Sequence, residues 1–241
     1  MGPFLKAAPG RSQRGVGALD IAIVFIAATA VGSIMAVTLL NLSQRATNDG
    51  GAAAERGLNE AAGALTLRGG VLTARGSVDV DGDNAINLAG DDDQAVVKLS
   101  FVLAASDGGI PVDLTPPYTT DSTGFDPDSS GLAYSTLIGF SSGDFQVTDG
   151  AWTISFPGSD DGDYMLEQGE RAEITLWLHR YDGANAHYDL GAGSGDPYVD
   201  TSAGLLLANE PFSIEVRVKG GGTLEIQRVT PLELGASDML E

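Results

Sequence analysis

The chain has 241 residues and a formal net charge of −20, because 33 aspartates and glutamates outnumber 13 lysines and arginines. Such a chain lacks the basic surface that phosphate binding requires, so we expect no nucleic-acid partner. It contains no cysteine, which excludes disulfides and thiolate metal ligands. Two interpretations of the acidity stay open: general solubility, and adaptation to high salt, where a Debye length of about 3 Å at 1 M screens neighbouring carboxylates.

Residues 1–15 form a short basic leader that ends in Arg14-Gly15. A Sec-type secretory signal has its apolar region before the cleavage site, whereas here the apolar region follows it. Cleavage between Gly15 and Val16 would therefore leave the apolar segment on the mature protein. This layout resembles the class III signal of type IV pilin-like subunits, which implies processing by a prepilin-type signal peptidase.

Residues 16–64 are predicted to form an N-terminal helix. Residues 21–40 contain no charged side chain, and twenty helical residues span about 30 Å, the thickness of a bilayer's hydrocarbon core. The basic leader predicts a cytoplasmic start and an outer location for the rest of the chain. Ala28, Gly32 and Ala36 form a stripe of small residues along which another helix could approach. A plain membrane anchor would also tolerate this stripe, so both interpretations remain open.

Residues 65–241 are predicted to form a separate β domain. Short β-branched runs alternate with Gly, Asp, Asn and Pro clusters, and residues 212–218 show a period of two. This pattern predicts an antiparallel β-sandwich or barrel. The fold class is therefore α+β, with a long N-terminal hydrophobic α-helix followed by the β domain. The expected strands are 70–80, 95–105, 132–140, 152–156, 172–179, 211–218 and 223–230, and residues 182–204 are expected to form a loop.

Both ends of the chain resemble the archaellin family, the filament subunits of the archaeal motility structure. At the N-terminus, Gly15 precedes Phe25 by ten positions, and Phe25 lies within Ile-Val-Phe-Ile-Ala. Residues 166–174, Leu-Glu-Gln-Gly-Glu-Arg-Ala-Glu-Ile, resemble the family's Gly-Glu turn before a strand. Residues 211–217 and 220–231 resemble its closing hairpin and Arg-x-x-Pro tail.

The resemblance implies a structural subunit that polymerises through its N-terminal helix into the archaellum filament used for swimming. Its implied partners are further copies of itself or other archaellins, and the cytoplasmic membrane before assembly. The implied location is an extracellular filament. An archaeal adhesion pilin, or a membrane-anchored adhesion or binding domain, remains the alternative.

Asp20 departs from the archaellin pattern, in which Gly-Ile-Gly-Thr usually precedes the apolar run. If Val16 is the mature N-terminus, Asp20 is the fifth residue, where bacterial type IV pilins carry a glutamate. A carboxylate within a helix bundle is costly unless paired, and the α-amine of Val16 on a neighbouring subunit would be its partner. Alternatively, Asp20 is a helix-start acid favoured by the macrodipole.

Asp79, Asp81 and Asp83 have the spacing of half a calcium loop. The loop lacks the glycine expected at its sixth position and the glutamate expected at its twelfth, so a solvated acidic turn is the alternative.

The two histidines, His179 and His187, would need further ligands to bind zinc. The sequence contains no nucleophile elbow, P-loop or dinucleotide fingerprint, so we expect no enzymatic activity and no required cofactor beyond a possible Ca²⁺.

Overall fold

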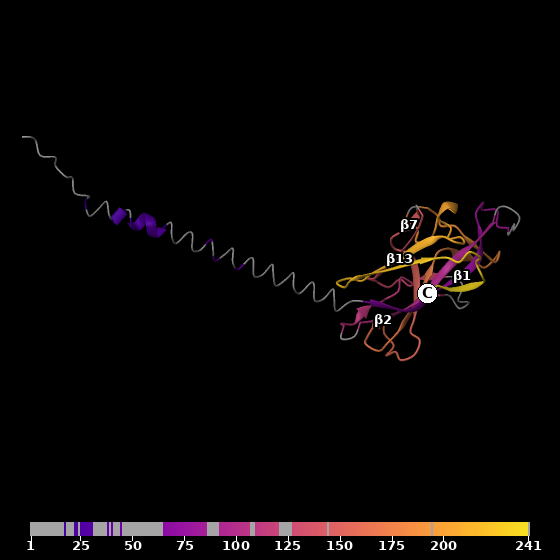
Figure 1. Cartoon of the computed structure of the whole chain (residues 1–241), viewed down its shortest axis with the longest axis horizontal. Coiled ribbons are helices and arrows are strands. Elements are labelled where there is room, and N and C mark those ends of the chain that lie inside the picture. The colour runs from indigo at the N-terminus through magenta and orange to yellow at the C-terminus, as the bar shows by residue number, and fades with distance from the viewer. Residues whose placement is uncertain are drawn as a thin grey trace, which may run out of the picture. The chain divides into compact units, whose positions relative to one another are not determined.

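The computed structural model describes residues 17, 22–23, 25–30, 38, 40, 44, 65–85, 92–106, 109–120, 127–143, 145–193 and 195–240. The chain divides into two units, residues 1–55 and residues 56–241. We call the second the β unit and describe each unit by itself (Figure 1).

The described residues of the first unit are helical, except Gly17. They are residues 22, 23, 25–30, 38, 40 and 44. No helix made of described residues is long and apolar enough to cross a membrane. The other residues of the predicted helix 16–64 lie outside the described part of the chain, so its full length stays a prediction.

Two sheets form most of the described β unit. The larger sheet is centred on two long neighbouring strands, β1 (Leu65–Asp79) and β2 (Asp92–Ala105). Its other strands are β8 (Ala151–Ser155), β10 (Ala172–Trp177), β11 (Arg180–Asp182), β12 (His187–Asp189) and β15 (Ser237–Leu240). Their order is β11-β12-β1-β2-β10-β8, and β15 pairs with β1. The C-terminal strand, yellow in Figure 1, therefore lies beside β1.

The smaller sheet has the order β14-β13-β6-β7. Its strands are β6 (Leu137–Ser142), β7 (Phe145–Val147), β13 (Pro211–Arg217) and β14 (Thr223–Val229). The remaining elements are short: β3 (Val112–Asp113) pairs with β9 (Met165–Leu166), β4 (Tyr118–Thr120) pairs with β5 (Pro127–Ser129), and a 3₁₀ turn spans Ser202–Gly204.

One hydrophobic core lies between the two sheets. On β13, Phe212, Ile214 and Val216 are buried, and the residues between them are half-buried, as the period of two predicts. Their side chains belong to the same buried cluster as Phe101 of β2 and Trp152 of β8 in the larger sheet. Two sheets that share a core in this way form a sandwich.

The sandwich differs from the sequence prediction around β12. It contains one parallel pair, β1 with β12, in which Val78 lies opposite Tyr188 and Asp79 opposite Asp189. The expected loop 182–204 contains β12, which pairs with β11 as well as with β1. A strand of three residues is too short to show a period, so the Gly- and Asp-rich composition around it dominated the prediction.

Candidate functional site

Most residues predicted for processing and assembly lie outside the described part of the chain; they are Arg14, Gly15, Val16, Asp20, Gly32 and Ala36. Phe25 and Ala28 are described, and both are helical and exposed, with 70 % of Phe25 accessible. The Thr29 hydroxyl donates to the helix's own carbonyls, 3.0 Å from the oxygen of Phe25 and 2.9 Å from that of Ile26. The one polar side chain in this turn is thus satisfied within the helix.

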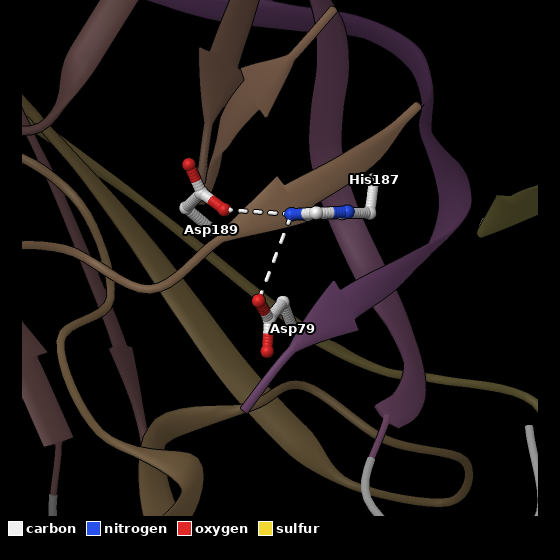
Figure 2. Close-up of side chains that lie close together, drawn as sticks. All are labelled: Asp79, His187 and Asp189. Carbon is white, nitrogen blue, oxygen red and sulfur yellow. Dashed lines mark hydrogen bonds and ion pairs between the residues drawn. The ribbon is translucent and has the colours of Figure 1, made fainter. Parts of the chain in front are cut away.

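In the β unit, one histidine and three aspartates meet at the ends of three strands. Asp79 ends β1, Asp182 ends β11, and His187 and Asp189 begin and end β12. The Nε2 atom of His187 lies 3.1 Å from Oδ1 of Asp189, 3.7 Å from Oδ2 of Asp79 and 3.9 Å from Oδ2 of Asp182. Figure 2 shows the imidazole edge directed between Asp79 and Asp189. We call these four residues the His187 cluster.

Burial and backbone amides determine the charges in this cluster. His187 is 1 % exposed and Asp79 is 5 % exposed. Burial raises the pKa of Asp79, but the amides of Asn84 and Gly82, which donate to its two oxygens, outweigh burial and lower the pKa.

Asp182 is also held in its ionised form. The Ala184 amide and the Asn185 side chain donate to its oxygens at 2.8 and 2.7 Å, and they lower its pKa. Two carboxylates with lowered pKa values therefore lie beside His187, and Asp189 adds a third carboxylate at the closest distance. Among the described residues, no lysine or arginine forms an ion pair with this cluster.

A tight turn positions the histidine. The Ala186 amide donates to the carbonyl of Asp182 at 2.8 Å, and Ala186 has a φ of 60°, which places it in the left-handed region. An alanine there is strained by about 1 kcal/mol, and such strain is found preferentially at functional sites. The turn connects β11 to β12 and directs His187 towards the end of β1.

The cluster has the donor set of a divalent metal centre. One donor atom each from Asp79, His187 and Asp189 lies within 4.8 Å of the others. Around a tetrahedral cation with bonds of about 2.0–2.1 Å, donor atoms are separated by about 3.3 Å, close to the distances from Nε2 to Asp189 and Asp79. Imidazole with carboxylates suits zinc and similar transition-metal ions better than calcium, which prefers oxygen ligands only.

The predicted calcium loop lies next to this cluster and shares Asp79 with it. Carboxylate oxygens of Asp79, Asp81 and Asp83 can approach within 4.8 Å of one another. However, the Asp83 amide donates to Asp81, and the Ala85 amide donates to Asp83 at 2.7 Å, so each carboxylate already caps the turn. The backbone hydrogen bond from Asp83 lowers the pKa of Asp81, but desolvation and the charges of Asp83 and Asp79 outweigh it and raise the pKa. Calcium binding at this loop stays a prediction.

Sequence reasoning named His187 as a histidine that lacked further ligands, but it did not identify the aspartates that lie beside it. His187, Asp189 and Asp182 lie about one hundred residues after Asp79, and only the parallel pairing of β1 with β12 brings them together. The available signal was the alternation His187-Tyr188-Asp189, which places the histidine and the aspartate on one face of a strand.

Exposed apolar side chains on the described N-terminal helical residues and a separate β-sandwich fit the class of filament subunits. The sequence matches the archaeal-type flagellin family over residues 15–228. The chain belongs to this family, and it is a structural subunit of an archaellum filament.

Individual relatives are similar over nearly their whole length. One is a "probable flagellin 1" of Archaeoglobus fulgidus, 26 % identical over 223 residues, or 92 % of each chain. Another is a "probable flagellin 1" of Aeropyrum pernix, 27 % identical over 237 residues, or 93 % of this chain and 95 % of the relative.

Two solved structures are similar at low sequence identity. The archaeal flagellum of Methanospirillum hungatei has a TM-score of 0.47 and 16 % identity, covering 93 % of this chain and 98 % of that one. An archaeal flagellin crystal structure from Methanocaldococcus jannaschii has a TM-score of 0.42 and 12 % identity, covering 73 % and 97 %.

Proposed function

We propose that the subunit is cut after Gly15, held in the cytoplasmic membrane by its N-terminal helix, and then polymerised with further copies of itself through that helix. The observation that carries this proposal is the exposure of the helix's apolar side chains. Ile23, Phe25 and Ile26 are 57 %, 70 % and 66 % exposed within the single chain. Exposed apolar surface of this kind marks a membrane or protein contact.

The physical reason for assembly through this helix is close packing. Burying apolar side chains between helices instead of in lipid gains little hydrophobic free energy, so small residues that let the backbones approach must supply the attraction. Ala28, Gly32 and Ala36 form the proposed contact stripe. The β-sandwich then forms the outer part of the filament and presents the acidic surface to solvent.

Gly32→Leu tests this proposal. We expect the variant to insert into the membrane and to be processed, but to form no filaments, because a leucine would hold the helices apart. Gly32→Ala, which adds one methyl group, is the matched control and should still assemble. Electron microscopy measures assembly, and N-terminal sequencing of the membrane-inserted subunit should begin at Val16. Normal filaments from Gly32→Leu would refute packing along this stripe.

The donor spacing of the His187 cluster favours a second function, and we propose that the cluster holds a divalent transition-metal ion. Asp79, His187 and Asp189 would supply the ligands, and the Asp182 carboxylate would lie next to them. The dication would compensate the carboxylates that the amide hydrogen bonds keep ionised. It would tie β1 to β12 across an interval of about one hundred residues, and would so stabilise the edge of the larger sheet.

Zinc titration of the purified subunit tests the metal proposal. Saturating Zn²⁺ is expected to raise the melting temperature by about 5 °C, since binding to the folded state alone stabilises it. His187→Asn should abolish the shift, while Asp161→Asn, in a separate exposed acidic group, should retain it. Loss of the zinc shift in Asp81→Asn but not in His187→Asn would move the site to the sequence-predicted loop. An unchanged melting temperature in the unsubstituted chain would contradict the proposal.

A further inference from the structure

Two strand edges of the β unit lie unpaired at the same end of the sandwich. Among the described strands, β14 pairs only with β13, and β15 pairs only with β1. A groove of about 500 Å³ adjoins both edges, lined by Gln227, Arg228 and Val229 of β14, by Pro231, and by Met239 and Leu240 of β15. Unpaired edges can accept a further strand from another chain.

The side chains around this groove are unusually apolar for such an acidic protein. Met239 and Val229, which line the groove, are 66 % and 55 % exposed, and Leu232, next in the chain after the lining residue Pro231, is 79 % exposed. These are the highest values among the large hydrophobic residues described in the β unit. Leu72, which lies opposite Met239 in the β1–β15 register, is a fourth exposed apolar residue there. Apolar side chains clustered in this way mark an interaction surface rather than the scattered exposure of an ordinary monomer.

Arg228 gives the groove a positive charge and an unmet hydrogen bond. Its Nη1 donates to the Gln227 carbonyl at 2.7 Å, but its Nε is buried and has no partner. A buried donor without an acceptor is unfavourable. A carboxylate that enters the groove would pair with the exposed end of the Arg228 guanidinium, and guanidinium–carboxylate pairs are among the strong hydrogen bonds of proteins.

The composition of the chain itself identifies the occupant. The full chain carries 33 acidic residues against 13 basic ones, so carboxylates are the commonest charged groups that another copy can offer. We propose that the groove is a contact between neighbouring subunits, in which a carboxylate-bearing extended segment of a second copy lies along β14 and binds Arg228. This inference rests on the proposed function, because the filament is what brings a second copy to the groove.

The absence of cysteine permits a direct test in assembled filaments. Val229→Cys carries a maleimide-linked benzophenone into the groove, and Leu132→Cys, 45 % exposed on a loop, is the matched control. After irradiation of filaments, we expect about tenfold more cross-linked dimer from Val229→Cys, since a neighbour held in the groove has a high effective concentration. Mass spectrometry should place the cross-link on an acidic segment of the same chain.

A second variant measures how much the contact contributes to filament assembly. Val229→Asp should require about a tenfold higher subunit concentration for assembly, because it sets a carboxylate against the acidic segment. Its circular dichroism should be unchanged because the side chain is exposed, and Leu132→Asp should assemble normally. A charged side chain on an edge strand can also serve to keep other chains away, and this is the alternative role for Arg228. If this is its role, Val229→Cys will cross-link no more than Leu132→Cys, and Val229→Asp will assemble at the same concentration as Leu132→Asp. Either result overturns the inference. Failure of the unsubstituted chain to form filaments would overturn the proposed function as well.

Discussion

His179 and His187 lie eight residues apart, but their imidazole rings have different surroundings in the fold. His187 faces three carboxylates, whereas the ring of His179 is fully buried. Burial lowers the pKa of His179 from 6.5 to about 4, an effect that the backbone of Asp189 offsets in part. The ring is therefore neutral in the folded protein at neutral pH.

Because of this lowered pKa, the free energy of unfolding depends on pH. The unfolded chain takes up a proton at His179 more readily than the folded chain, so the free energy of unfolding falls as the pH drops from about 6.5 to about 4. The loss amounts to about 3 kcal/mol at most, at 1.36 kcal/mol per pKa unit. Urea unfolding at pH 7 and pH 5 measures it. His179→Leu should lose less stability over this interval than the unsubstituted chain; an equal loss in both would mean that His179 does not contribute.

At this scale the sequence was informative about single residues but not about their neighbours. The acidic loop at Asp79 was recognisable because aspartate occurs at every second position. The partnership of Asp79 with His187 was not, because no local pattern encodes a pairing between strands so far apart in the chain. The burial of His179 was also not readable from residue type, since histidine occurs with intermediate frequency in protein interiors.

At the scale of elements, β1 connects most of the larger sheet. It pairs with β2 along one edge and with β15 and β12 along the other. Gly76 lies within this strand, and a Cβ atom there would come within 2.7 Å of the Tyr188 ring and 2.9 Å of a Val97 methyl group. The absence of a side chain at Gly76 is what allows Tyr188 of β12 to pack against β1.

Gly76→Ala is therefore expected to destabilise the β unit by about 1–3 kcal/mol, the usual cost of overpacking. Displacement of Tyr188 should also disturb His187 and Asp189, its neighbours on β12, so the zinc response should weaken. Gly183→Ala is the control, because its added Cβ would meet only Tyr181, at 3.9 Å. Chemical denaturation compares the two variants. Equal stability would show that β12 can shift without cost.

The elements that the sequence predicted are the long, alternating ones. Strands β2, β10, β13 and β14 begin or end within a few residues of the expected bounds, because each shows several periods of burial. β12 and β15, of three and four residues, were missed because tertiary pairing with β1 creates them. Residues 132–136 were expected to be strand but form an irregular segment before β6, so local β propensity was overridden there.

At the scale of the whole molecule, charge and assembly oppose one another. The full chain carries a formal charge of −20, which the proposed loss of Lys6, Arg11 and Arg14 with the leader would change to −23. A filament places many such subunits side by side. At molar salt the Debye length is about 3 Å, so neighbouring outer domains scarcely repel one another; at about 0.01 M it is about 30 Å, and repulsion acts across whole subunits. The helical core is insensitive to this change because its proposed contacts are apolar and close.

We therefore predict an order of events on dilution: the outer β domains loosen or unfold first, and the filaments fragment second. Circular dichroism follows the β domain, and electron microscopy follows filament length, across a salt series from about 2 M to about 0.01 M. If the groove at β14 joins subunits through Arg228, Val229→Asp filaments should fragment at a higher salt concentration than unsubstituted ones. A β domain equally folded at both ends of the series, on unbroken filaments, would show that the acidity serves solubility and is not an adaptation to salt.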